Sequence, residues 1–158
     1  MAPPAQVPPA QVPPVRVSRF ADLEPATMYR ILRLRSEVFI VEQECAYRDL
    51  DGRDVEATAW HLWIDGAGPT VAATARLLTD PDGTRVLGRI VTAAGERGRG
   101  RAGALIDRAL ALVAPSEVVD LNAQSRLEPW YGRWGFTRVG PDFVEDGIAH
   151  VPMRRVTP

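Results

Sequence analysis

The segment from residue 86 to residue 113 constrains the fold more strongly than any other part of the sequence. Apolar and β-branched residues at 86–91 predict a strand that ends near Thr92. From Ala102 to Val113, apolar residues recur at the spacing of one helix face, which predicts an amphipathic helix. Between them, residues 97–103 are rich in glycine and contain the pattern R-x-x-G-x-A. The segment therefore predicts a strand, a glycine-rich turn and a helix in succession.

The glycine-rich turn has the properties of an anion-binding site. Small residues allow close backbone approach, and the first amide N–H groups of a helix have no partner within it. The positive end of the helix dipole favours a phosphate or pyrophosphate there, beside Arg97, Arg99 and Arg101. A Walker loop is excluded because the sequence has no lysine, and the glycine spacing does not match a dinucleotide fingerprint. The alternative is a solvated loop before an ordinary helix start.

Composition and charge limit the class of protein. The chain has 158 residues, of which 46% are hydrophobic, so we expect one domain with a proper core. A formal charge of -1 gives no general attraction to nucleic acid or to an anionic membrane. Cys45 is the single cysteine, and no apolar run approaches the ~18 residues of a membrane span. We therefore expect a cytoplasmic protein that binds neither nucleic acid nor a membrane.

Residues 1–14 differ in composition from the rest of the chain. They contain six prolines and repeat the sequence Ala-Gln-Val-Pro-Pro, so they lack backbone donors and bury little apolar surface. We expect a disordered proline-rich tail, which serves as a spacer or as a docking ligand. Residues 15–158 are then expected to form a single domain.

Apolar periodicity predicts further elements along this domain. Strands are expected at 15–20, 60–65, 70–78, 86–92, 118–124, 136–139 and 148–155, and helices at 25–42 and 102–113. Glycine-containing turns join the second, third and fourth strands into an antiparallel meander. The helix between the fourth and fifth strands is a crossover connection, which makes these two strands parallel.

Two charged residues, Arg35 and Glu42, lie on the apolar stripe of the first predicted helix. Charged groups on a buried stripe are costly unless they are paired or line a cavity, and both interpretations stay open. The acidic segment 42–54 is expected to be a loop or short helix beside a cleft. Its carboxylates Asp49 and Asp51 either hold a cationic amine or cap local backbone.

Two motifs flank the fifth predicted strand. The first is Arg-x-x-Gly-x-Ala at 97–102, and the second is Trp-Tyr-Gly-Arg-Trp-Gly-Phe at 130–136. In this order they resemble the acyl-CoA-binding turn and the later short helix of the GNAT N-acetyltransferases. Within that family, residues 15–156 most resemble the ElaA-like subfamily. The matching residues include Leu34-Arg35, 38–43, Cys45, Tyr47, Asp49, Asp51, His61, Ala75-Arg76-Leu77, Gly88-Arg89-Ile90, Ala123-Gln124, 145–148 and His150.

The resemblance implies an α/β fold of the GNAT type, with acetyl-CoA as cosubstrate. The expected sheet is mixed and mainly antiparallel, with about six or seven strands flanked by helices. Its fourth and fifth strands would be parallel and splayed, so that the arm of acetyl-CoA lies between them. The implied cofactor-binding residues are Ile90, Val91 and Thr92 in the fourth strand, Arg97, Gly98, Arg99, Gly100, Arg101 and Ala102 in the turn, and Asn122 and Gln124 in the fifth strand.

The resemblance also implies a catalytic centre. A primary amine with a pKa near 10 is mostly protonated at neutral pH and must lose a proton before it attacks a thioester. By motif match, Tyr131 lies beside the departing sulfur and would protonate it or donate a hydrogen bond to it. Glu42 is placed with Tyr131 among the catalytic residues. The base stays open among Glu42, a water chain and the side chains of Asp49, His61, Glu145, Asp146 and His150.

The acceptor pocket is expected beside this centre, with Arg35 and Gln43 on one side and Glu145 and His150 on the other. The predicted function is transfer of an acetyl group from acetyl-CoA to a primary amine of a small molecule or peptide, by direct attack in a ternary complex. No metal is expected, and a homodimer is compatible with the prediction. Two rival functions are a non-catalytic acyl-CoA- or nucleotide-binding regulatory domain and an RNA-associated protein that uses the arginines of the turn.

Overall fold

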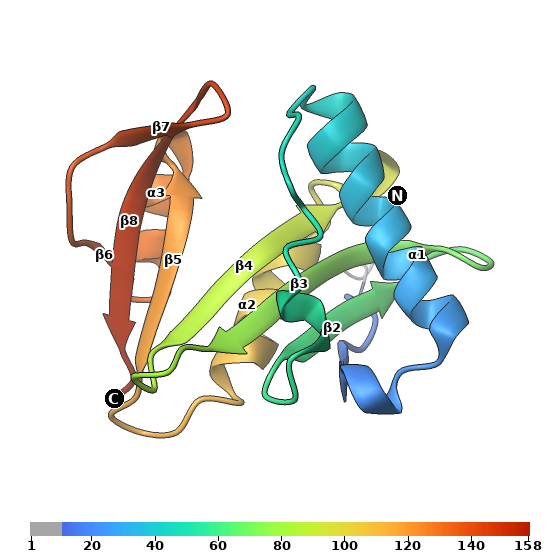
Figure 1. The fold of residues 1–158 in the computed structure, drawn as a ribbon, viewed down its shortest axis with the longest axis horizontal. Helices are drawn as coiled ribbons and strands as arrows, with labels where there is room; N and C mark the ends of the chain where they lie inside the picture. The colour runs from blue at the N-terminus through green and yellow to red at the C-terminus, as the bar shows by residue number, and fades with distance from the viewer. Residues whose placement is uncertain (1–10) are drawn as a thin grey trace, which may run out of the picture.

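The computed structural model describes residues 11–158; the predicted tail lies mostly in residues 1–10, outside that range. Residues 11–14 form neither helix nor strand. The rest of the described chain forms a twisted sheet with helices on both faces (Figure 1).

Within residues 11–158, eight strands form one mixed sheet in the order β1-β2-β3-β4-β5-β8-β6, with β7 paired to β8. They are β1 Arg16–Arg19, β2 Trp60–Asp65, β3 Val71–Thr79, β4 Arg85–Thr92, β5 Val118–Gln124, β6 Thr137–Arg138, β7 Phe143–Glu145 and β8 Ile148–Val156. The pair β4–β5 is parallel, and the other pairs in the described chain are antiparallel. The predicted mixed, mainly antiparallel sheet is confirmed.

The sheet has one strand more than predicted because β7 forms a hairpin with β8. Asp146 and Gly147 connect the two strands and have φ values of 50° and 78°. Two successive residues with positive φ are characteristic of a tight hairpin turn. The sequence Glu-Asp-Gly carried the turn signal, but the three residues of β7 are too few to show a strand periodicity.

The parallel pair β4–β5 is joined only at its start. Arg85 pairs with Val119 and Val86 with Asp120, and the strands then diverge (Figure 1). Beyond Val86, no described residue of β4 is in register with β5, so this edge of β4 is open. The predicted splaying of the fourth and fifth strands is confirmed.

Three α-helices of the described chain pack on the sheet. They are α1 Pro25–Arg35, α2 Arg101–Leu110 and α3 Glu128–Gly132. The predicted helix 25–42 exists over its full length, but its last part, Ser36–Glu42, is π-helical. A π-helical turn is uncommon and often lies at a functional site, and this one ends at the splayed strands.

The core has two layers because α1 and α2 lie on opposite faces of the sheet (Figure 1). Leu105 and Ile106 of α2 are fully buried against one face, and Ile31 and Leu34 of α1 against the other. Strand β3 is covered on both faces, and its residues 71–78 are all buried. A doubly covered strand needs a nearly continuous apolar sequence, which residues 71–75 provide.

A β-bulge lies in β4, next to the point of divergence. Thr74 of β3 pairs with Val91 and Arg76 pairs with Gly88, so two residues of β4, Arg89 and Ile90, oppose a single residue of β3. Arg89 has a φ of 54°, a left-handed conformation that costs a non-glycine residue about 1 kcal/mol. Bulges bend a strand and increase its twist. This one lies in the part of β4 that follows its last pair with β5, at Val86.

Candidate active site

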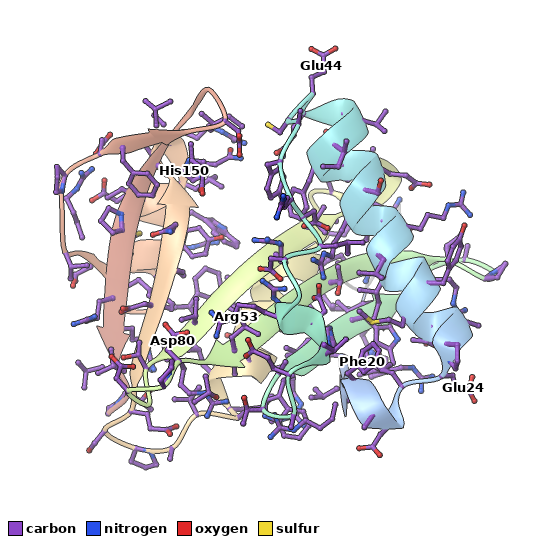
Figure 2. The ribbon with its side chains drawn as sticks, in the orientation of Figure 1. Phe20, Glu24, Glu44, Arg53, Asp80 and His150 are labelled. Atoms are coloured by element: carbon purple, nitrogen blue, oxygen red, sulfur yellow. The ribbon has the colours of Figure 1, made fainter. Side chains whose placement is uncertain are left out.

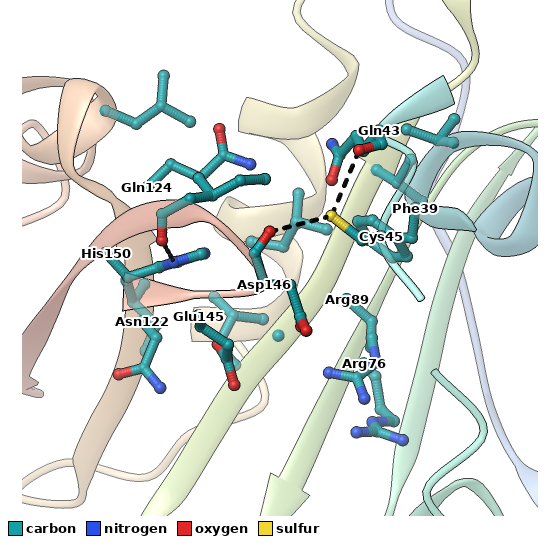
Figure 3. A pocket seen from close by; sticks show the side chains of 18 of the residues that line it. Phe39, Gln43, Cys45, Arg76, Arg89, Asn122, Gln124, Glu145, Asp146 and His150 are labelled. Atoms are coloured by element: carbon teal, nitrogen blue, oxygen red, sulfur yellow. Dashed lines mark hydrogen bonds between the residues drawn. The ribbon is translucent and has the colours of Figure 1, made fainter. Parts of the chain in front are cut away.

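A cavity of about 670 Å³ lies where β4 and β5 diverge. Its walls come from the end of the π-helical turn and the following loop, from β3, β4 and β5, from α3, and from the β7–β8 hairpin. Figure 3 shows Asn122 and His150 on the β5–β8 side, across from Arg89 on the β4 side. The two halves of the splayed sheet therefore form opposite walls of the cavity.

The glycine-rich turn forms a second cavity of about 600 Å³ at the start of α2. Gly98 and Gly100 have φ values of 73° and 74°, which glycine adopts without Cβ strain. The first helical hydrogen bond runs from Ala104 N to the carbonyl of the N-cap, Gly100, at 3.1 Å. The amides of residues 101–103 therefore have no helical acceptor, and together with the helix dipole they suit a phosphate group.

The two cavities are contiguous because Thr92 and Arg97 line both of them. The structure brings nearly all the predicted cofactor-binding residues to this path. Ile90, Val91, Asn122 and Gln124 line the first cavity, and Gly98, Gly100, Arg101 and Ala102 line the second. The exception is the side chain of Arg99, which is 58% exposed and lies 3.7 Å from Glu96 at the surface.

Arg97 connects the glycine-rich turn to the π-helical turn. Its Nη2 lies 2.8 Å from Oε1 of Glu42, and the two side chains are 45% and 44% exposed. Its Nε also donates a hydrogen bond to the carbonyl of Thr92 at 3.3 Å. The predicted catalytic residue Glu42 therefore lines the cavity, but its carboxylate is already bound by a cation.

Tyr131 lies in α3 with its side chain against the first cavity. The residue is 8% exposed, and its ring makes edge contacts with Trp130 and Phe136. Burial raises the pKa of the Tyr131 phenol to about 12. The hydroxyl therefore keeps its proton throughout the neutral pH range and can donate a hydrogen bond.

The structure does not place Arg35 at the acceptor pocket, where the sequence analysis expected it. Its side chain is 1% exposed and does not line the cavity. The guanidinium donates to Asp49 Oδ2 at 2.9 Å and to Asp54 Oδ1 at 2.6 Å. Arg35 is thus the centre of a buried ion-pair cluster, which was the alternative interpretation of a charge on the apolar stripe.

The same cluster accounts for the acidic segment 42–54. Arg76 binds Asp51 and Asp54 at 2.7 and 3.0 Å, and Arg89 lies 2.8 Å from Asp49. The cluster consists of three arginines and three aspartates, Arg35, Arg76, Arg89, Asp49, Asp51 and Asp54, so its formal charges cancel. These carboxylates are therefore not available to bind a cationic amine. Asp51 also caps local backbone, as the other interpretation expected: its Oδ1 accepts a hydrogen bond from the backbone N–H of Arg53 at 3.0 Å.

The remaining candidates for a base fall into two groups. Asp49 is held in the ion-pair cluster, and His61 is 1% exposed, with Nε2 only 2.8 Å from the carbonyl of Asp54. Burial lowers the pKa of His61. In contrast, Glu145, Asp146 and His150 line the first cavity, as does the predicted acceptor residue Gln43.

Arg76 and Arg89 were given no role by the sequence analysis, although both line the first cavity. Arg76 is 4% exposed within the otherwise apolar strand β3. An arginine inside a buried strand requires a carboxylate partner, so the position of Arg76 in an apolar run already indicated an ion pair. The partner could not be read from it, because Asp51 and Asp54 precede Arg76 by more than 20 residues.

The fold and the path between the two cavities define an acyl-CoA-dependent transferase, and comparison with known proteins agrees. Residues 32–157 match the model of the acetyltransferase (GNAT) domain. The chain therefore belongs to the GNAT acetyltransferase family. No helix among residues 11–158 has both the length and the apolarity of a membrane span.

Relatives within this family are similar over most of the chain. The UPF0039 protein Rv2851c of Mycobacterium tuberculosis is 41% identical over 137 residues, which cover 85% of this chain and 87% of that protein. An acyl-CoA N-acyltransferase from Pseudomonas aeruginosa is 36% identical with a TM-score of 0.84, covering 90% of this chain and 99% of the other. Escherichia coli ElaA is 31% identical with a TM-score of 0.83, covering 90% and 98%. The resemblance to ElaA-like proteins is thus confirmed.

Proposed function

We propose that this protein transfers an acetyl group from acetyl-CoA to a primary amine of a small molecule or peptide, by direct attack in a ternary complex. The observation that carries the proposal is the pair of contiguous cavities, which share Thr92 and Arg97. One cavity offers amide donors to a pyrophosphate, and the other is lined both by Tyr131 and by the open edge of β4. An elongated cosubstrate with a phosphate at one end and a thioester at the other suits this arrangement.

In this proposal, the open edge of β4 binds the arm of the cosubstrate. Ile90, Val91 and Thr92 line the first cavity and have no register partner on β5, so backbone groups of this edge can pair with a ligand; the Thr92 carbonyl already accepts a hydrogen bond from Arg97 Nε. A backbone N–H from this edge would also donate to the thioester oxygen as negative charge develops on it. One well-placed donor of this kind is typically worth about 10²- to 10³-fold in rate.

Tyr131 acts as a hydrogen-bond donor to the departing sulfur. Complete proton transfer from a phenol with a pKa of about 12 to a thiolate whose conjugate acid has a pKa near 8.5 would be unfavourable by about 5 kcal/mol. A hydrogen bond from the same hydroxyl needs no proton transfer and still stabilises the negative charge on sulfur. We therefore expect a moderate contribution to the rate from Tyr131.

The acceptor approaches along the wall formed by Gln43 and the β7–β8 hairpin. Glu145 and Asp146 form no ion pair with any residue in the range 11–158, so their carboxylates are available to a protonated amine. The preference for a cationic acceptor thus rests on the hairpin, because the acidic segment 42–54 is neutralised by arginine.

The test is an assay of thiol release from acetyl-CoA with a panel of primary amines, combined with calorimetric titration of acetyl-CoA. We expect amine-dependent thiol release and acetylated product by mass spectrometry. A protein that binds acetyl-CoA but acetylates no amine in the panel would instead be the non-catalytic acyl-CoA-binding domain. Failure to bind acetyl-CoA at all would contradict the assignment of both cavities.

A further inference from the structure

Several carboxylates in or near the first cavity already bind an opposite charge. Glu42 is paired with Arg97, and Asp49 and Asp51 are paired with arginines of the buried cluster. A carboxylate of the buried cluster can accept a proton from an incoming amine only at the cost of its arginine pair. The exposed pair of Glu42 with Arg97 is worth little, so Glu42 needs a test of its own. The carboxylates and imidazole on the cavity wall that form no ion pair within residues 11–158 are Glu145, Asp146 and His150.

The contacts of His150 fix which of its ring nitrogens carries the proton. Nδ1 lies 2.8 Å from the carbonyl oxygen of Ile148. A carbonyl oxygen can only accept a hydrogen bond, so Nδ1 must carry the hydrogen. In the neutral ring, the lone pair is therefore on Nε2, the nitrogen that points away from Ile148.

The ring of His150 is also held in place. It stacks on Phe143, with ring centroids 5.7 Å apart and planes inclined by 23°. His150 pairs with Gln124 of β5, and both side chains line the first cavity (Figure 3). Two constraints from the β7–β8 hairpin thus orient the imidazole at the wall that faces β4.

We infer that His150 is the general base that deprotonates the acceptor amine, an assignment that rests on the proposed acetyl transfer. Nε2 takes one proton from the ammonium group and later passes it to solvent. The freed electron pair of the amine forms the N–C bond to the thioester carbon, and the C–S bond breaks with its electron pair going to sulfur. The second proton leaves the nitrogen once the amide forms and ends on the departing thiol, while the hydroxyl of Tyr131 stabilises the sulfur.

Other charged and titratable groups face the same cavity and contribute to its electrostatic environment. They are Glu145 and Asp146 on the hairpin, Glu42, Cys45 and Tyr47 on the π-helical turn and the following loop, Arg76 and Arg89 on β3 and β4, Arg97 in the glycine-rich turn, and Arg126 and Tyr131 after β5. Among them, Glu145 and Asp146 are the carboxylates without an arginine partner in residues 11–158. They are therefore the strongest alternatives to His150 as the general base.

The decisive variant is His150→Asn. Its amide NH2 can replace the Nδ1 hydrogen bond to Ile148, whereas the Nε2 lone pair is lost. At neutral pH we expect kcat to fall by about 10²-fold, with acetyl-CoA affinity within about twofold of wild type, because general-base catalysis is typically worth 10² to 10⁴. The acidic limb with its plateau, which marks a base on the enzyme, should disappear from the kcat/KM profile of this variant, and the rate should instead rise with hydroxide concentration over the whole range.

A second measurement separates a lost base from a distorted pocket. Acceptor amines with progressively lower pKa are increasingly deprotonated before they bind, so they need less help from a base. The ratio of wild-type to His150→Asn rates should shrink towards one along such a series. A variant that is equally impaired with every amine would show that His150 only shapes the pocket, and would overturn the inference.

Asp146→Asn and Glu145→Gln are matched controls from the same hairpin. Each should retain the wild-type pH profile, with any loss confined to the KM for cationic amines. If one of them, or Glu42→Gln, removes the acidic limb while His150→Asn keeps it, the base is a carboxylate and the inference is wrong. Absence of amine acetylation by the wild-type protein would be a different result, because it would overturn the proposed function itself.

Discussion

Arg97 binds Glu42 at 2.8 Å, and this ion pair links the glycine-rich turn to the end of the π-helical turn. Arg97 lines both cavities, so a pyrophosphate bound at the glycine-rich turn would compete with Glu42 for its charge. In the proposed function, binding of acetyl-CoA draws Arg97 towards phosphate and weakens its hold on Glu42. Cosubstrate binding would then alter the charge on the acceptor side of the cavity.

Glu42→Gln should therefore tighten acetyl-CoA binding. Arg97 would no longer need to leave a carboxylate, and an exposed pair of this kind is worth at most about 1 kcal/mol, so we expect a twofold to fivefold gain. Calorimetric titration measures it. Glu37→Gln, which removes an exposed partner of Arg33 elsewhere on the same helical segment, should leave the affinity unchanged. Weaker binding by Glu42→Gln would show that the pair preorganises the turn.

Gly100→Val should weaken acetyl-CoA binding while the domain stays folded. Gly100 has a φ of 74°, and a β-branched side chain in that conformation is strained by roughly 1–2 kcal/mol, which would displace the amides of the turn. We expect at least a tenfold loss of affinity by calorimetry. Gly95→Ala is a suitable control, because its backbone is not left-handed and an added Cβ meets nothing within 4 Å. Unchanged affinity in Gly100→Val would exclude the turn as the pyrophosphate site.

Arg35→Met should destabilise the fold. It leaves Asp49 and Asp54 buried without their shared partner, and breaking a buried pair in this way costs about 3–5 kcal/mol. For a domain of this size we expect a fall in Tm of about 10 °C. Arg33→Met, on the same helix but in an exposed pair, should change the unfolding free energy by less than about 0.5 kcal/mol. Equal stability of the two variants would contradict the structural role of Arg35.

The buried cluster also predicts a stability that falls in acid. Burial alone would raise the pKa of Asp54, but hydrogen bonds and charge from Arg35 and Arg76 outweigh it and lower the pKa. The pKa of Asp51 is lowered in the same way, mainly by its hydrogen bond to Arg76 against the effect of burial. A depressed folded-state pKa stabilises the protein above the unfolded value, near pH 3.9, and the effect is lost at lower pH.

Chemical denaturation as a function of pH measures this effect. The contribution of Asp51 and Asp54 to the unfolding free energy should be nearly constant from about pH 7 to pH 5. It should decline below about pH 4. In Arg76→Met, the pKa values of Asp51 and Asp54 are depressed less, so the loss of unfolding free energy below about pH 4 should be smaller, while its onset, set by the unfolded pKa, stays the same. An identical acid profile in wild type and Arg76→Met would refute the assigned pKa shifts.

The local part of the fold was readable from the sequence. The strand–turn–helix from β4 to α2 was predicted from a change of apolar period from strand to helix, and the tight turn between them from its small residues. The parallel direction of β4 and β5 followed from the helix between them. The order of the two motifs along the chain, at 97–102 and 130–136, also indicated the family.

The cavity walls were harder to predict because they depend on pairing across long stretches of chain. The position of Arg35 on an apolar stripe showed that its charge must be compensated, but not whether a ligand or Asp54 would do so. The bulge at Arg89 arises from its register with β3 and has no periodicity signal. Likewise, the proton position on His150 depends on a carbonyl in its own strand, and only the folded geometry reveals it.

The central claim is that acetyl transfer takes place at the cavity between β4 and β5, with Tyr131 beside the departing sulfur. Turnover of Tyr131→Phe tests it most directly, because the substitution keeps the buried ring and removes only the hydroxyl. We predict that kcat falls by roughly 10²-fold and that acetyl-CoA affinity stays nearly unchanged, since the lost hydrogen bond strengthens mainly in the transition state. Wild-type turnover by Tyr131→Phe, measured where chemistry limits the rate, would contradict the claim.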